Sequence, residues 1–158
     1  MTIDSALFRS VLGRFATGVT VVTTRDAEGR DHGMTVSAFS SVSLDPPLVL
    51  CCIERRTAMH AVLERAQTFA VNILSASQEA LSRRFSEREH ERFDGIGYER
   101  GQSGAALLEG VLGYLECRIV ARHEAGDHTI VVGEVENAEA HRGAPLLYYR
   151  GGYNQLGQ

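Results

Sequence analysis

The sequence has few cysteines and no surplus of basic residues, and both shortages limit the kinds of protein it can be. Only 3 of its 158 residues are Cys, and neighbouring positions such as Cys51 and Cys52 rarely suit disulfide geometry. We therefore expect a reducing, cytoplasmic setting. Lys and Arg number 16 against 20 Asp and Glu, and their scattered placement argues against a nucleic-acid partner.

Several diagnostic patterns are also missing from the chain. The first ten residues lack the basic region and apolar core of a signal peptide, and no apolar run approaches the ~20 residues of a membrane span. We therefore expect a protein that is neither exported nor embedded in a membrane. There is no glycine-rich phosphate loop of either common type and no Cys-x-x-Cys or His-Glu-x-x-His pattern. The sequence therefore predicts no metal site.

What is present is enough for one hydrophobic core, because 44% of the residues are hydrophobic, and we expect a single domain over residues 1–158. Helical spacing predicts helices over 3–17, 57–65 and 77–85. Apolar or β-branched runs predict strands over 19–24, 34–44, 48–53, 69–74, 113–123, 129–140 and 146–149. We expect 48–53 to be buried on both faces, 86–92 and the following glycines to form an exposed loop, and the hairpin of 113–140 to close the sheet. Hairpin connections and peripheral helices predict a mainly β fold, an antiparallel barrel rather than a doubly wound parallel sheet.

Small and hydroxyl side chains fill the predicted strand of residues 34–44, where bulkier residues would be usual. Strand alternation puts Thr35, Ser37 and Ser41 on one face and Val36, Ala38 and Ser40 on the other. Small side chains let a planar ligand approach backbone groups, and hydroxyls can donate to a phosphate. The alternative is a solvated strand that happens to be rich in Ser.

Charged groups at the ends of other elements are weaker candidates. Arg56 and Thr57 follow a strand and open a helix, which favours an anion but equally suits a solvated turn with a helix cap. Arg83 stands near the end of a predicted helix, where a cation is also expected for structural reasons. His128 begins a strand, as a ring that could contact a ligand or as an exposed turn residue. The three cysteines lie in apolar runs and are expected to be buried core thiols.

Taken in order, these stretches resemble the short-chain flavin reductases that serve two-component flavin-dependent monooxygenases. The resemblance extends over nearly the whole chain. It rests on Phe8-Arg9 through Gly13, on Phe15-Ala16-Thr17-Gly18-Val19-Thr20-Val21-Val22-Thr23, on the run from Thr35 to Ser43, on Pro46-Pro47-Leu48, on Phe69-Ala70-Val71-Asn72-Ile73-Leu74, on Gly126-Asp127-His128 through Gly133-Glu134-Val135, and on Pro145-Leu146-Leu147-Tyr148-Tyr149-Arg150-Gly151-Gly152-Tyr153.

The resemblance implies an antiparallel split β-barrel of the FMN-binding type that forms a homodimer, with flavin held near the subunit interface. By position, Thr35, Val36, Ser37 and Ala38 would line the flavin ring, and Ser40, Ser41, Arg56 and Thr57 would hold its phosphate. Cys52, Ile53 and Glu54 would contribute mostly backbone atoms, Arg83 and Phe85 would flank the phosphate or the adenine of FAD, and His128 and Tyr153 would face the nicotinamide. The family varies at Cys52, Arg56 and Thr57.

The implied activity is reduction of FMN or FAD by NADH or NADPH, with release of reduced flavin to a separate monooxygenase. Hydride transfer between stacked rings needs no obligatory acid or base, so His128 is expected to help at most. Three other functions stay open: a flavin carrier without turnover, an oxidase of the pyridoxamine-phosphate type on the same barrel, and a barrel for an unrelated apolar ligand. The sequence does not choose between the two flavins or the two nicotinamide cofactors.

Overall fold

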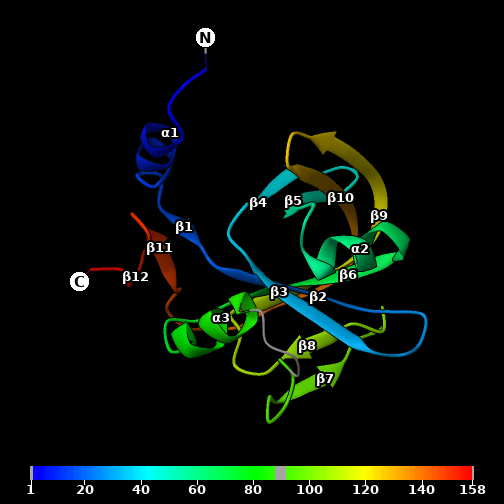
Figure 1. The fold of residues 1–158 in the computed structure, drawn as a ribbon. Coiled ribbons are helices and arrows are strands. Elements are labelled where there is room, and N and C mark those ends of the chain that lie inside the picture. Colours follow the sequence, from blue (N-terminus) through cyan, green and yellow to red (C-terminus); the bar gives the residue numbers. More distant parts are fainter. Residues whose placement is uncertain (1, 88–91, 158) are drawn as a thin grey trace.

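The computed structural model describes residues 2–87 and 92–157, and a seven-stranded antiparallel sheet dominates it (Figure 1). The strand order is β3-β2-β6-β9-β10-β5-β4. The strands span β2 Thr20–Arg25, β3 Asp31–Val36, β4 Phe39–Ser43, β5 Leu48–Glu54, β6 Thr68–Ile73, β9 Gly113–Ala125 and β10 His128–Ala140. The mainly β prediction is therefore correct.

The two edges of this sheet, β3 and β4, are consecutive in the chain and are separated only by Ser37 and Ala38. The Cα atoms of Val36 and Phe39 are therefore at most about 11 Å apart. Two edges of a seven-stranded sheet can lie so close only if the sheet curls strongly. Among the described residues, β3 pairs only with β2 and β4 only with β5, so the curled sheet does not close into a barrel. The β9–β10 hairpin lies in the middle of the sheet, so the prediction that it closes the sheet is wrong.

Three helices and two small sheets complete the described chain. The helices are α1 Ser5–Leu12, α2 Ala58–Arg65 and α3 Glu79–Ser86. One small sheet has the order β1-β11-β12, with β1 Thr17–Gly18, β11 Leu147–Tyr149 and β12 Gly152–Asn154. The other pairs β7 Tyr98–Arg100 with β8 Ala106–Leu108. No helix of the described residues is long and apolar enough to cross a membrane.

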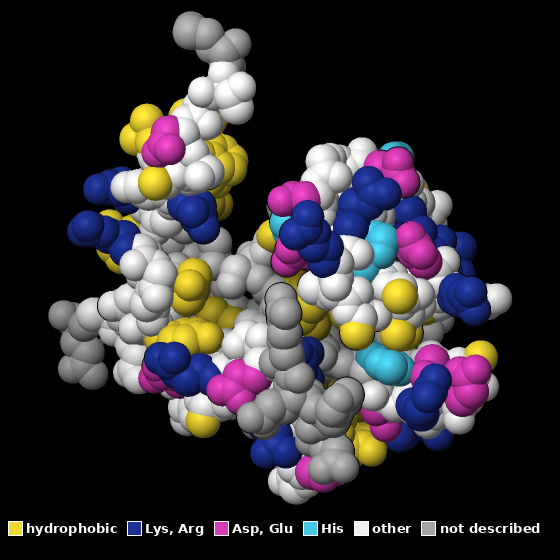
Figure 2. Space-filling model, in the orientation of Figure 1, with side chains coloured by type: hydrophobic (Ala, Val, Ile, Leu, Met, Phe, Trp, Pro, Cys, Tyr) yellow, Lys and Arg dark blue, Asp and Glu magenta, His cyan; other side chains and the backbone are white. Residues whose placement is uncertain are grey.

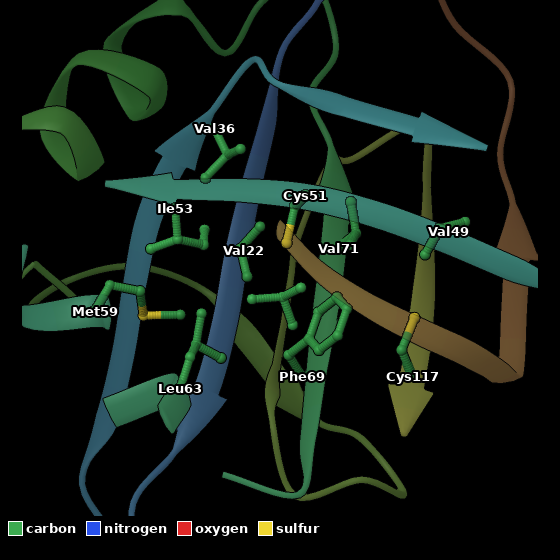
Figure 3. Close-up of a cluster of buried hydrophobic side chains, with 11 residues drawn as sticks. Val22, Val36, Val49, Cys51, Ile53, Met59, Leu63, Phe69, Val71 and Cys117 are labelled. Carbon is green, nitrogen blue, oxygen red and sulfur yellow. The ribbon is translucent and has the colours of Figure 1, made fainter. Parts of the chain in front are cut away.

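The main core lies inside the curl of the large sheet, with α2 packed over it (Figure 3). On β5, Val49, Cys51 and Ile53 point into this core, whereas alternate residues such as Cys52 are only half-buried. The prediction that this strand is buried on both faces is therefore wrong, and so is the prediction that Cys52 is a core thiol. Burial raises the pKa of both Cys51 and Cys117 to about 12, so these two thiols are inert, as expected.

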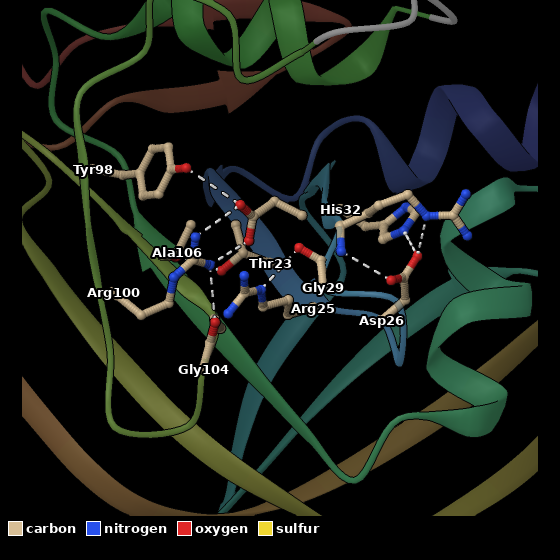
Figure 4. Close-up of polar contacts among 12 residues, drawn as sticks. Thr23, Arg25, Asp26, Gly29, His32, Tyr98, Arg100, Gly104 and Ala106 are labelled. Carbon is tan, nitrogen blue, oxygen red and sulfur yellow. Dashed lines mark hydrogen bonds and ion pairs between the residues drawn. The ribbon is translucent and has the colours of Figure 1, made fainter.

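The β7–β8 hairpin occupies part of the region that the sequence predicts to be an exposed loop. Ala105 and Ala106 are almost fully buried, and Arg100 forms an ion pair with Asp31 of β3 at 2.5 Å, which holds the hairpin against the edge of the sheet (Figure 4). Tyr98 donates a second hydrogen bond to the same carboxylate, at 3.3 Å. The loop prediction is wrong for residues 98–108, because the aliphatic side chains of residues 105–108 are buried and Tyr98 packs against a buried cluster of the core. Its charged part at residues 88–91 lies outside the described residues.

The first helix is shorter than predicted and projects from the body of the protein (Figure 1). Asp4 caps its first turn, accepting a hydrogen bond from Leu7 N–H at 3.0 Å, and the helix ends at Gly13 rather than Gly18. Thr17 and Gly18 instead form β1, because they pair with β11. None of the residues of α1 is buried. Six apolar side chains on and around this helix are more than half exposed: Ile3, Leu7, Phe8, Val11, Leu12 and Phe15 (Figure 2).

Candidate functional site

The break between β3 and β4 brings the small residues of the predicted ligand strand to one place. Residues 34–44 do not form one continuous strand, so the predicted alternation of Thr35 to Ser41 does not hold. The chain turns at Ser37, whose carbonyl accepts a hydrogen bond from Phe39 N–H at 2.9 Å. The Ala38 carbonyl accepts from Cys52 N–H at 3.0 Å, which sets the break directly beside β5. Ser40 and Ser41 follow on β4, opposite Leu50 and Val49, and both are exposed.

Charged residues cluster where the last residue of β5 lies beside the first residue of β10. Glu54 and His128 are paired across the two strands, and the His128 ring Nδ1 lies 2.7 Å from the Asp127 carboxylate. That hydrogen bond, together with the charge of His128 and of Arg56, lowers the pKa of Asp127. The carboxylate is therefore ionised at neutral pH and fixes the orientation of the His128 ring.

The hydroxyl of Thr57 is already engaged in the start of α2. It donates to the Glu54 carbonyl at 2.8 Å and accepts from His60 N–H at 3.2 Å. The prediction that this residue caps the helix is confirmed. Its single hydroxyl proton has a partner, so a phosphate at this end of β5 would depend on the exposed Arg56 guanidinium rather than on Thr57.

A second group of predicted residues meets on α3. The Thr35 hydroxyl on β3 donates to the main-chain oxygen of Ser82 at 2.6 Å, and the Ser82 hydroxyl lies 2.7 Å from the Tyr153 hydroxyl on β12. The guanidinium of Arg83 stands over the Tyr153 ring, 4.9 Å from its centroid. Arg83 also bonds Glu79 at 2.8 Å, and this carboxylate raises its pKa. One turn of helix thus joins three predicted ligand residues.

Three predicted site residues are placed in the core instead. The side chains of Phe85 and Ile53 are fully buried, and that of Val36 is 4% exposed. Phe85 packs so tightly under Gly33 that a Cβ at this glycine would approach its ring to 2.7 Å. Phe85 therefore supports β3 from behind and does not present its ring to a ligand on the surface, and Val36 and Ile53 have only backbone atoms to offer.

Ser82 and Glu79 were not among the predicted residues. Ser82 lies on the same helix face as Phe85, at a spacing of three. A small polar residue on the apolar face of a predicted helix was the sequence signal that could have identified Ser82. α3 also borders a hollow of about 860 Å³ that Arg83 lines together with Gly95 and Glu109. Within the described residues, no group of three or more His, Cys, Asp or Glu side chains could hold a metal ion.

The two groups lie apart in a single chain. Figure 1 shows β1, β11 and β12 beside α1 on one side of the molecule and β5 and β10 on the other. The break at Ser37 and Ala38 connects the two groups. Thr35, just before the break, bonds Ser82 of the α3 group, and Ala38 bonds Cys52 of β5. In the part of the chain that the structure describes, each flanking strand pairs on one side only, so both offer main-chain groups to the polar edge of a planar ring. With the exposed Arg56 four positions after Cys52, this arrangement fits a flavin nucleotide.

Comparison with known proteins identifies the relatives of this chain. A sequence model described as "Flavin reductase like domain" matches residues 12–157. The chain is 45% identical to the FMN reductase (NADH) SmoA of Agrobacterium fabrum, covering 97% of this chain and 87% of that protein. It is 39% identical to HsaB of Rhodococcus jostii, the reductase subunit of a flavin-dependent monooxygenase, covering 98% and 79%. The solved NADH:FAD oxidoreductase SgcE6 of Streptomyces globisporus, in complex with NAD and FAD fragments, superposes with a TM-score of 0.93 at 40% identity and covers 98% and 93%.

Proposed function

The chain belongs to the flavin reductase-like family, and we propose that it oxidises NADH, passes the hydride to FMN or FAD and releases the reduced flavin to a separate monooxygenase. The observation that carries this proposal is the meeting of two open strand edges at Ser37 and Ala38, beside Cys52. When bound, the flavin supplies the ring that accepts the hydride. The chain holds that ring, orients the nicotinamide and excludes water.

The flavin ring would lie against the backbone of residues 35–38 and 52–54, where the side chains of Val36 and Ile53 point into the core and those of Ser37, Ala38 and Cys52 are small. The phosphate would lie near Ser40, Ser41 and the exposed Arg56, since Thr57 caps the N-terminus of α2 and a helix N-terminus attracts anions. Arg83, at the rim of the hollow beside α3, would contact the outer phosphate or the adenine of FAD. His128 and Tyr153 would face the nicotinamide from its two sides.

A second copy of the chain would complete this site. His128 and Tyr153 belong to the two separate groups of one chain, yet both are assigned to the same nicotinamide. The projecting α1 has an apolar face with no buried side chain, and such a face is stabilised when a partner covers it. The curled sheet would then be the split barrel of the family, in a homodimer. The three free cysteines fit a reducing cytoplasm.

The test is the absorbance of the nicotinamide band after the purified protein is mixed with NADH or NADPH, with FMN, FAD or no flavin. Rapid loss of absorbance with NADH that requires added flavin is the expected result, and it also shows which flavin is preferred. A reductase that treats flavin as a substrate is colourless when purified, so colour alone does not decide. Tight flavin binding without any loss of absorbance would contradict the proposal and favour a flavin carrier or an oxidase.

A further inference from the structure

Ser82 is fully buried, and two of its polar groups face two different ligand-binding candidates. Its main-chain oxygen accepts a hydrogen bond from the Thr35 hydroxyl at 2.6 Å, and its side-chain hydroxyl lies 2.7 Å from the Tyr153 hydroxyl. Thr35 is in the large sheet and Tyr153 is in the small β1-β11-β12 sheet. Ser82 therefore links the strand assigned to flavin with the residue assigned to nicotinamide.

The Tyr153 ring is held from three directions. Arg83 lies over its face, Tyr148 meets it edge-on with ring centroids 5.5 Å apart, and Ser82 holds its hydroxyl. The strand registers Thr17↔Tyr148 and Tyr148↔Tyr153 place Thr17, Tyr148 and Tyr153 in one row across the small sheet. The first two ring contacts are broad and tolerate rotation of the ring, whereas the hydroxyl contact is directional and defines its orientation.

We propose that Ser82 is a positioning residue for the nicotinamide cofactor, because its hydroxyl fixes the Tyr153 ring. The inference rests on the proposed function of the protein. The two links made by Ser82 can be cut separately. Ser82→Ala removes the bond to Tyr153 but keeps the main-chain oxygen that holds Thr35, so the flavin strand stays in place. Thr35→Val removes the other link and leaves Tyr153 held.

Ser82→Ala should raise the KM for NADH about three- to tenfold, the range expected for one neutral hydrogen bond. Its kcat and its flavin dissociation constant should stay within about twofold of the wild type. Tyr153→Phe should have a similar effect, because it removes the same bond from the other side. Thr35→Val should show the opposite pattern, with weaker flavin binding and a nearly unchanged KM for NADH.

The experiment measures steady-state NADH oxidation, flavin binding by fluorescence quenching and thermal unfolding for each variant. Ser86→Ala is the matched control, because Ser86 lies on the same helix and its hydroxyl donates a hydrogen bond to the Arg83 carbonyl of that helix, at 2.7 Å. The double variant Ser82→Ala/Tyr153→Phe should be no worse than either single variant, since both remove one interaction.

Additive effects in the double variant, or an unchanged KM in Ser82→Ala, would overturn the inference. So would a parallel loss of flavin affinity and melting temperature in Ser82→Ala, because that pattern indicates a purely structural role. The wild-type assay separates this inference from the proposed function. A wild type that oxidises no nicotinamide overturns both, whereas an active wild type with an unaffected Ser82→Ala variant overturns only the role of Ser82.

Discussion

The buried carboxylate of Glu116 accepts two hydrogen bonds from Ser103, from its backbone N–H at 2.9 Å and from its hydroxyl at 2.5 Å. The Asn137 side chain donates a third, at 2.7 Å. Glu116 is on β9, Asn137 on β10, and Ser103 lies in the turn of the β7–β8 hairpin. One ionised group, only 2% exposed, thus fastens that hairpin to the centre of the large sheet.

Replacing Glu116 by Gln should destabilise the protein by about 2–4 kcal/mol at neutral pH, because a Gln amide cannot accept all three bonds. Burial raises the pKa of Glu116, but the bonds from Ser103 and Asn137 outweigh it, and the net pKa is lowered. A carboxylate with a lowered folded-state pKa stabilises the fold above its unfolded pKa of ~4.3, and this contribution is lost as the pH falls through the folded value.

Urea unfolding at neutral pH and at about pH 3.5, where the unfolded-state carboxyl is mostly protonated, measures both effects. The difference between wild type and Glu116→Gln should be largest at neutral pH and should shrink in acid. Glu99→Gln is the control, on the same hairpin but exposed, and should change stability by less than about 0.5 kcal/mol. A Glu116→Gln variant as stable as this control would refute the fastening role.

Cys52 should be the reactive thiol of the native protein, and flavin should protect it. Cys51 and Cys117 are fully buried or nearly so, with pKa values raised to about 12, whereas Cys52 is half-buried, and partial burial raises its pKa. A thiol reagent should therefore modify one group per chain in the folded state and three after denaturation. Added FMN or FAD should slow this labelling.

The matched variant for this experiment is Cys52→Ser, which should abolish labelling of the folded protein because the two core thiols stay unlabelled. Labelling that proceeds at the same rate with saturating flavin would show that the ring does not cover β5 at this position. Labelling of two or more thiols in folded wild type would contradict the burial of the other cysteines.

His128→Ala should raise the KM for the nicotinamide cofactor more than it weakens flavin binding. His128 is oriented by the Asp127 carboxylate 2.7 Å away, and hydride transfer itself requires no proton from it. Steady-state kinetics with NADH varied at saturating flavin, and flavin titration without NADH, separate the two effects. Arg65→Ala, at the exposed end of α2, is a suitable control. Kinetics identical to the wild type would remove His128 from the site.

Much of the sheet could be predicted from the sequence because its strands carry their own signals. β2 and β6 are β-branched or apolar almost throughout and are buried almost throughout, and Thr57 caps α2 as its position suggests. The break at Ser37 and Ala38 has no Gly or Pro to mark it. β12 was missed because Arg150, a non-glycine residue, adopts a positive φ of 51° ahead of Gly151, forming the tight turn that returns the chain.

The candidate site was predictable as a set of segments but not as a set of side chains. Which segments meet in the fold depends on strand register. The family resemblance indicated Thr35, Cys52 and Tyr153 as site residues without any knowledge of that register. Whether a side chain faces the ligand or the core depends on packing between distant elements. Phe85 shows this: its ring fits against Gly33 of β3, a contact across 52 positions that no local pattern records. The buried Glu116 is hidden for the same reason.

Charge introduced on the apolar face of α1 should separate the proposed homodimer. Val11 is 55% exposed in one chain, and Val11→Asp would bury an unpaired carboxylate wherever a partner covers this face, which costs several kcal/mol. Ala6→Asp is the matched control, since helical geometry turns Ala6 away from Leu7 and Val11. Sedimentation should show a dimer for wild type and control and a monomer for Val11→Asp. Because His128 and Tyr153 of one chain lie in separate groups, flavin-dependent NADH oxidation should fall together with dimerisation, and a fully active Val11→Asp monomer would show that one chain holds a complete site.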